Sequence, residues 1–202
     1  MNKKKVIFLI LVILLIITGV VFISKNMTKN KKNGNNMNSQ EIVDSILNLN
    51  SYKAKVFVQV NSNKNQNKYI LEQEYNTENG SVQTVIEPSN IAGVKITKKD
   101  KNLSIENSEL DLKTIFENYQ GLEDNSLDLI NFITEYKENN NSSYEEKDDE
   151  IIMEVKNSKN NKYLNNKMLY INKNELKPIK LVIQDNNQNT TIFIEYNEIE
   201  LN

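Results

Sequence analysis

Apolar and polar residues alternate along the C-terminal end of the chain, from Lys167 to Asn202. Two turn-forming stretches, residues 172–175 and 185–189, divide this region into three segments. A period of two between Asn-rich and Asp-rich turns is typical of half-buried antiparallel strands. Pro178 stands at the start of the second segment, where a strand tolerates a missing N–H. We therefore expect a three-stranded meander with one apolar face that another part of the chain must cover.

The same alternation predicts further strands. Within residues 52–60 every second residue is apolar, while the intervening positions are mostly polar. Residues 68–75 and 81–87 flank the turn-forming stretch 77–80 and predict a hairpin. Two shorter hairpins are expected, formed by residues 94–97 with 103–106 and by residues 144–147 with 151–156.

Helical spacing predicts three helices. The first begins at Asn38, which with Glu41 has the spacing of a capping box, and continues as an apolar stripe to residue 49. A second helix is expected over residues 110–119, with Gly121 as its C-terminal stop. The third carries an apolar stripe over residues 129–136 and ends within residues 139–143. Its expected N-cap is one of three residues, Asp124, Asn125 or Ser126.

Strands and helices are thus segregated along the chain, which indicates the α+β class. We expect a strongly curved antiparallel β-sheet, a half-barrel, with the helices on its concave side. Such a geometry can leave an apolar cavity between helices and sheet, and a ligand could bind there. The candidate lining residues share helical spacing: Ile115, Phe116, Tyr119, Leu129, Phe132 and Ile133. The alternative is an ordinary packed core, because a core and a lined cavity use the same residue types.

The N-terminal region predicts a membrane anchor. Three lysines precede an apolar run that begins at Val6 and ends at Ile23. As a helix this run would reach roughly 27 Å, close to the hydrocarbon thickness of a bilayer. Residues 1–23 are therefore interpreted as a transmembrane signal anchor, residues 24–37 as a flexible polar linker, and residues 38–202 as the folded domain. A cleaved signal peptide is the alternative, but no small-residue cleavage site follows the run.

The same lysines predict the orientation of the anchor in the membrane. Positive charge before the apolar run favours a cytoplasmic N-terminus, so the domain is expected on the extracytoplasmic side. Seven lysines precede Met37, whereas all 27 acidic residues follow it, so the remainder of the chain has a net charge of −9. An acidic surface repels nucleic acid, and we expect no partner of that class.

The amino-acid composition excludes several kinds of catalytic site. The chain has no His, no Cys and no Trp, and all of its 25 basic residues are Lys. A Ser-His-Asp triad, a thiol nucleophile and a bidentate Arg clamp are therefore excluded. The acidic run 145–150 and the Asn-rich stretch 185–189 do not fit a calcium loop and are interpreted as solvated turns. We expect no catalytic, cofactor-binding or metal-binding residues; an enzyme based on a carboxylate pair stays a less favoured alternative.

The order of these elements resembles the LolA-like lipoprotein-carrier superfamily. The resemblance rests on a capped first helix, on residues 52–56 and on the closing segments 169–172, 176–178 and 192–196. The middle segments 88–94, 103–107 and 112–119 are similar to clostridial germination lipoproteins of the GerS type. Together the similarity covers residues 38–202. The chain departs from both groups, because it has no Cys for a lipid anchor and no Arg for a carrier cavity.

The resemblance implies a curved half-barrel without catalytic residues. GerS-type proteins act at the outer side of the inner spore membrane as partners of a cortex-modifying amidase, and LolA-type proteins carry acyl chains. Our first hypothesis is a non-enzymatic binding protein, anchored by one helix in the cell or inner spore membrane, that serves a cell-wall amidase in germination. The alternative is a protein that binds a lipid or a lipoprotein acyl chain in its cavity. An exposed sheet edge could also add a strand from a partner or from a second copy, giving a homodimer.

Overall fold

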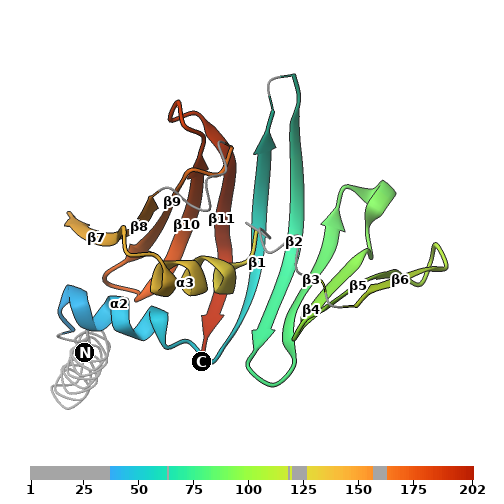
Figure 1. Cartoon of the computed structure of the whole chain (residues 1–202), viewed down its shortest axis with the longest axis horizontal. Helices are drawn as coiled ribbons and strands as arrows, with labels where there is room; N and C mark the ends of the chain where they lie inside the picture. The colour runs from blue at the N-terminus through green and yellow to red at the C-terminus, as the bar shows by residue number, and fades with distance from the viewer. Residues whose placement is uncertain (1–36, 63, 118, 120–126, 157–162) are drawn as a thin grey trace, which may run out of the picture. The chain divides into compact units, whose positions relative to one another are not determined.

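The computed structural model describes residues 37–62, 64–117, 119, 127–156 and 163–202 (Figure 1). The chain divides into two compact units, residues 1–36 and 37–202, and the following account concerns the second. The predicted anchor, residues 1–23, and almost all of the predicted linker lie outside the described residues. No helix within the described ranges is long and apolar enough to cross a bilayer.

The described residues form one open antiparallel sheet of eleven strands, which confirms the α+β class. Its strands run in spatial order β6-β5-β4-β3-β2-β1-β11-β10-β9-β8-β7, so the first and last strands of the chain meet in the middle and β6 and β7 form the edges. The strand bounds are Ser51–Asn61 (β1), Gln66–Asn76 (β2), Gly80–Glu87 (β3), Lys95–Lys99 (β4), Asn102–Asn107 (β5), Leu112–Phe116 (β6), Ser142–Lys147 (β7), Glu150–Lys156 (β8), Asn166–Asn172 (β9), Lys177–Gln184 (β10) and Thr190–Leu201 (β11).

The register of the central strands confirms the alternation seen in the sequence. On β1, Tyr52, Ala54 and Val56 are buried, whereas Lys53 and Lys55 between them are exposed. Strands β9, β10 and β11 form the predicted C-terminal meander, joined at the predicted turns. The predicted hairpin of β2 and β3 also forms, and a Cβ at Gly80 would lie 2.1 Å from the carbonyl oxygen of Lys98. The turn therefore requires glycine at this position.

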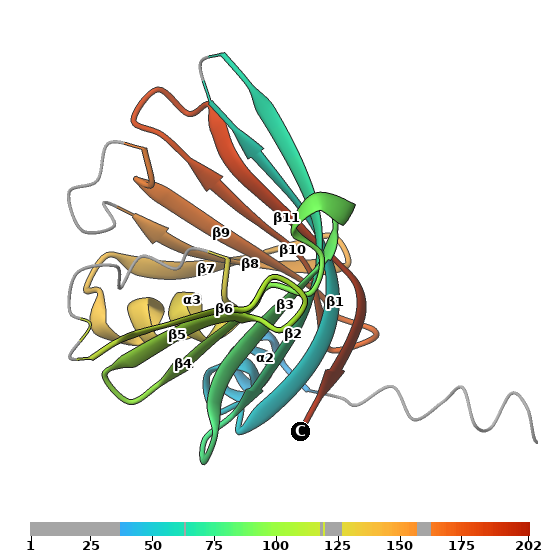
Figure 2. The same cartoon turned by 90° about the vertical axis from the view of Figure 1, so that its right-hand side faces the viewer.

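Two helices, α2 (Ser39–Leu47) and α3 (Leu129–Glu138), lie on the concave side of the sheet, which curves around them (Figure 2). A short 3-10 turn, η1 (Ser89–Ile91), follows β3. The predicted capping box of α2 is confirmed: the Glu41 N–H donates to Asn38 Oδ1 over 3.0 Å, and the Asn38 N–H donates to Glu41 Oε2 over 2.7 Å. The N-cap of α3 is Asp128. The prediction of a cap at residues 124–126 was wrong, and those residues lie outside the described ranges.

The predicted helix over residues 110–119 was also wrong. Residues 112–116 form β6, which pairs with β5. Asn107 Oδ1 accepts hydrogen bonds from the N–H groups of Glu109 (2.9 Å) and Leu110 (3.1 Å), and Asp111 adopts a φ of 48°. This local turn reverses the chain, so β6 returns along β5 instead of coiling. Gly121, the predicted helix stop, lies outside the described residues.

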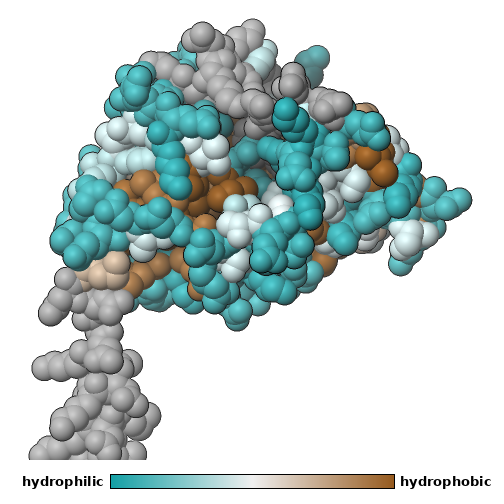
Figure 3. Space-filling view, turned by 60° about the horizontal axis from the view of Figure 1, so that its bottom comes forward, coloured by the Kyte–Doolittle hydropathy of each residue, from teal (hydrophilic) through white to brown (hydrophobic). Residues whose placement is uncertain are grey.

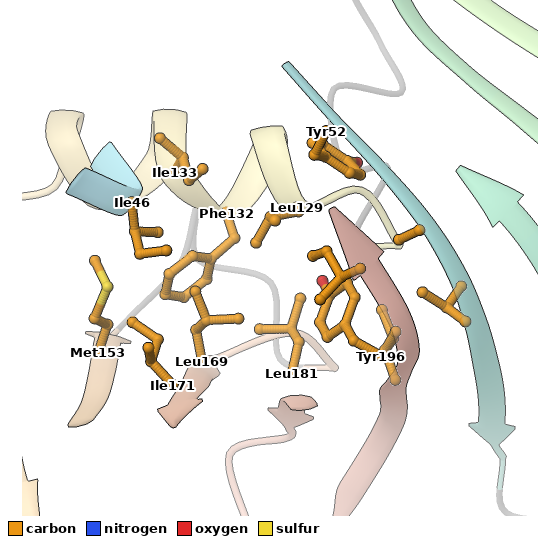
Figure 4. Packing of buried hydrophobic residues seen from close by; sticks show 14 of the residues in the cluster. Ile46, Tyr52, Leu129, Phe132, Ile133, Met153, Leu169, Ile171, Leu181 and Tyr196 are labelled. Atoms are coloured by element: carbon orange, nitrogen blue, oxygen red, sulfur yellow. The ribbon is translucent and has the colours of Figure 1, made fainter. Parts of the chain in front are cut away.

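The core lies between the helices α2 and α3 and the concave face of the sheet, chiefly strands β1 and β8 to β11 (Figure 4). Phe132 of α3 points into the middle of this layer, toward Leu169 and Ile171 of β9 (Figure 4). A buried ion pair also links α3 to the sheet, because Lys167 Nζ of β9 lies 2.5 Å from Glu135 Oε2 of α3. The helix is thus held to the sheet both by apolar contact and by a charged hydrogen bond.

The Phe132→Ala variant should be about 3–5 kcal/mol less stable than the wild type, because it leaves a cavity between α3 and β9. Urea unfolding of the domain measures this loss. Thr134→Ala, at an exposed position of the same helix, is the matched control and should change the free energy of unfolding by less than about 1 kcal/mol. Equal effects of the two variants would contradict this account of the core.

Candidate functional site

The six predicted cavity-lining residues do not form one group. Leu129, Phe132 and Ile133 belong to the packed core, with relative exposures of 0 %, 2 % and 1 %. Phe116 lies on the concave face of β6, is 43 % exposed, and has its ring centroid 6.1 Å from that of Tyr119. Ile115 points to the opposite face, where it is 55 % exposed, because successive residues of a strand alternate in direction.

A buried polar cluster receives the N-terminal end of α3. Asp128 Oδ1 accepts hydrogen bonds from the Tyr52 hydroxyl over 2.6 Å and from the Ile130 N–H over 3.2 Å, and the carboxylate also accepts one from Ser81. Gln73 Nε2 of β2 donates to the Leu127 carbonyl over 2.7 Å. These contacts place the first turn of α3 against the inner face of β1, β2 and β3.

Burial controls the ionisation of this cluster. Asp128 is 2 % exposed, and desolvation raises the pKa of its carboxyl above the ordinary value of 3.8, although Tyr52, Ser81 and Ile130 donate hydrogen bonds to it. The pKa of Tyr52 is likewise raised well above 10.0 by burial and by the neighbouring carboxylate. Tyr52 therefore stays neutral and keeps the proton that it donates.

Two further side chains at the cluster have no hydrogen-bond partner among the described residues, namely Gln83 at Nε2 and Tyr196 at its hydroxyl. The Tyr196 ring points from β11 toward the N-terminal end of α3 (Figure 4). Burial raises the pKa of Tyr196 too, with a smaller contribution from Asp128. Asp128 has donors on both sides and almost no exposure, so it positions the helix and is not accessible for acid–base chemistry.

In the view of Figure 3, apolar side chains gather in a recess in the middle of the domain, and hydrophilic side chains surround them. A cleft of about 590 Å³ lies where β1 ends and β11 begins, lined by apolar Val60, Leu164 and Ile192 and bordered by Lys64 and Asp185. Val60 and Ile192 are directly paired across the two strands and continue the concave face. No group of three or more acidic, His or Cys residues that could hold a metal occurs within the described ranges.

The convex face of the sheet carries an apolar stripe that the sequence analysis missed. It runs across neighbouring strands from β2 to β8, and we call it the convex belt: Ile70, Phe57, Phe193, Val182, Met168, Tyr170 and Ile152. Ile70 pairs directly with Phe57, and Val182 pairs with both Phe193 and Met168. All except Ile152 are half-buried. Both described helices lie on the other side of the sheet, so they do not cover this belt.

The convex belt is unusual for the outer face of an antiparallel sheet, which is commonly polar. Charged side chains border it: Lys180 Nζ lies 4.1 Å from the centroid of the Tyr170 ring, and Glu195 is paired with both Phe57 and Lys180. An apolar patch with a charged border is typical of a protein-interaction surface. Phe57 and Phe193 were the available signals, because each interrupts the polar positions of its strand.

The sequence profile of the family described as sporulation protein YdcC-like matches residues 3–202 of the chain. The chain belongs to this family. Among curated proteins, none matches it by sequence.

Solved structures share the fold of this YdcC-like protein. The structure of the CwlD amidase from Clostridioides difficile in complex with the GerS lipoprotein matches with a TM-score of 0.53 and 23% identity, over 81% of this chain and 96% of that chain. An uncharacterized conserved protein from Thermus thermophilus gives a TM-score of 0.54 at 11% identity, over 82% of this chain and 88% of that chain. The LolA superfamily protein NE2245 from Nitrosomonas europaea gives 0.43 at 13% identity, over 82% and 94%. The match to the complex that contains GerS confirms the predicted resemblance to GerS-type proteins at the level of the fold.

Asp128 gives this YdcC-like protein a specific pH dependence. Because its pKa is raised in the folded state, the folded domain binds a proton more tightly than the unfolded chain does, so ionisation costs stability as the pH rises from 3.8 through the raised value. Asp128→Asn keeps the acceptor for Tyr52 and Ile130 and removes the charge. The variant should be at least as stable as the wild type at pH 7, and the part of the pH dependence due to Asp128 should disappear.

Urea unfolding at several pH values measures this difference. Asp128→Ala removes the acceptor as well and should cost about 2–3 kcal/mol. Asp148→Asn, at an exposed hairpin tip, is the control for the loss of one charge. A loss of stability at pH 7 in Asp128→Asn as large as that in Asp128→Ala would refute the account of the cluster.

Proposed function

We propose that this protein is a non-enzymatic partner of an extracytoplasmic cell-wall amidase, acting in sporulation or in the cortex modification that prepares germination. Its membership of the sporulation protein YdcC-like family supports a role in sporulation. The fold that it shares with the structure of the CwlD amidase in complex with GerS supports the kind of partner. The absence of His and Cys from the whole chain agrees with a binding role, since it removes the commonest catalytic groups.

The observation that carries the proposal is the convex belt. A half-exposed row of aromatic and aliphatic side chains on a rigid sheet offers the apolar anchors that protein interfaces use. Its central members, Phe57 and Phe193, sit on β1 and β11, which are held on both sides by neighbouring strands. The amidase would dock on this face and leave the helices on the other side undisturbed.

We propose further that residues 6–23 anchor the chain in the cell or inner spore membrane by a single span, with the domain on the extracytoplasmic side. The three lysines before the apolar run support this orientation. A linker over residues 24–37, rich in Asn and Lys, would let the domain reach a partner at the membrane surface.

Pull-down of the tagged full-length chain from sporulating cells tests the amidase proposal. The wild type should recover a cell-wall amidase, and the Phe57→Thr/Met168→Thr double variant should recover at least about tenfold less, a loss that corresponds to roughly 1.4 kcal/mol. Threonine keeps the strand propensity and removes the apolar anchors. Leu110→Thr removes an exposed apolar side chain in the turn between β5 and β6 and is the matched control. Equal recovery by all three proteins, or no amidase with the wild type, would rule the proposal out.

A second candidate function, binding of a lipid or a lipoprotein acyl chain, is supported by the cleft of about 590 Å³ at the end of the concave face. This volume lies within the usual range for small-molecule sites, roughly 300–1,000 Å³. Val60, Leu164 and Ile192 would contact the chain, and Lys64 at the border could meet an anionic headgroup.

Native mass spectrometry of residues 37–202, which form one compact unit, tests this second candidate. Retained lipid should appear as a mass increment that Ile192→Glu abolishes, because a carboxylate in the cleft opposes an acyl chain. Ile86→Glu, at an exposed apolar position outside the cleft, should retain the increment. A domain that carries no lipid after incubation with membrane extract would exclude this function.

A further inference from the structure

The two edges of the sheet are protected very differently. The β7 edge carries Glu145, Glu146 and Lys147, and α2 fastens it, because the Tyr144 hydroxyl donates to Gln40 Oε1 over 3.1 Å and Ser39 Oγ donates to Glu146. Charges of this kind prevent pairing with another chain. At the other edge, every residue of β6 is exposed, and three of its five residues are large and apolar: Leu112, Ile115 and Phe116.

We propose that β6 pairs antiparallel with β6 of a second copy of this chain, with Ile115 on the two-fold axis. The occupant follows from the strand's own sequence, because β6 is complementary to itself in one register. A two-fold axis perpendicular to the sheet keeps the concave faces of both copies on the same side. Residues that face each other must then point to the same face, which excludes every register shifted by one residue.

The charged side chains that face each other distinguish the registers that remain. With Ile115 on the axis, Lys113 of each copy lies opposite Glu117 of the other, and the two Ile115 side chains meet on the convex face. On the concave face, Phe116 lies opposite Thr114. If Thr114 were on the axis, Lys113 would lie opposite Ile115, and no opposite charges would meet across the two strands. Opposite charges across strands stabilise, so the Ile115 register is favoured.

The size of the contact sets its strength. Pairing of two five-residue strands buries less surface than a standard interface of about 1,600 Å². The dimer should therefore be weak in dilute solution and form when copies are concentrated. This self-pairing is independent of the convex belt, because β6 lies at the edge of the sheet beyond β3, β4 and β5.

Cysteine crosslinking of the full-length chain in mild detergent tests the proposal, because the chain contains no Cys of its own. In the Ile115→Cys variant the two Cβ atoms would lie about 4.5–5.5 Å apart across the axis, within reach of a disulfide. Under mild oxidation this variant should crosslink at least about tenfold faster than Leu110→Cys, whose two copies would lie roughly 30 Å apart. Leu110 is 62 % exposed, so accessibility cannot explain a slower reaction.

Charge reversal tests the register. In the Ile115→Cys background, Lys113→Glu or Glu117→Lys alone should slow crosslinking about three- to tenfold, and the two together should restore it. Crosslinking of Ile115→Cys no faster than Leu110→Cys would overturn the self-pairing. Faster crosslinking of Thr114→Cys than of Ile115→Cys, or a double reversal that fails to restore the rate, would overturn the register.

Discussion

The packing of α3 against the inner face of the sheet is the contact on which the rest of this domain depends. An open antiparallel sheet with one apolar face is unstable until something covers that face. Phe132 and its neighbours on α3 supply the cover over β8 to β11, and Glu135 adds the buried pair with Lys167. Because β1 lies beside β11, the same contact also holds together the two ends of the described domain.

The polar cluster at Asp128 determines where α3 sits. Apolar side chains alone would allow the helix to shift along the sheet, since hydrophobic contact is not directional. Hydrogen bonds from Tyr52, Ser81 and Gln73 fix the first turn, and each of these residues comes from a different strand. The raised pKa of the buried carboxyl is the energetic cost of this arrangement. The polar groups therefore specify the position of α3 on the sheet, and the apolar contacts supply the strength of its packing.

The sequence predicted those features whose cause is local. The alternation in β9 to β11 and the capping box of Asn38 depend on residues a few positions apart. The helix predicted over residues 110–119 failed because Leu112, Ile115 and Phe116 fit a helical stripe, while the deciding turn at Asn107 lies outside it. The cluster at Asp128 could not be predicted, and Phe57 and Phe193 gave only an isolated signal of the convex belt, since both features arise from the register of strands far apart in sequence, above all β1 with β11.

The two candidate surfaces of the sheet make different demands on a partner. The convex belt is a face, so a partner that docks there needs shape complementarity to half-exposed side chains. The β6 edge also offers main-chain hydrogen bonds, so its partner needs an extended strand of matching charge. Self-pairing at β6 about an axis perpendicular to the sheet would place the convex belts of both copies on the same side. A dimer of this kind would hold two docked partners side by side, so pairing at the edge would set the spacing of whatever binds the face.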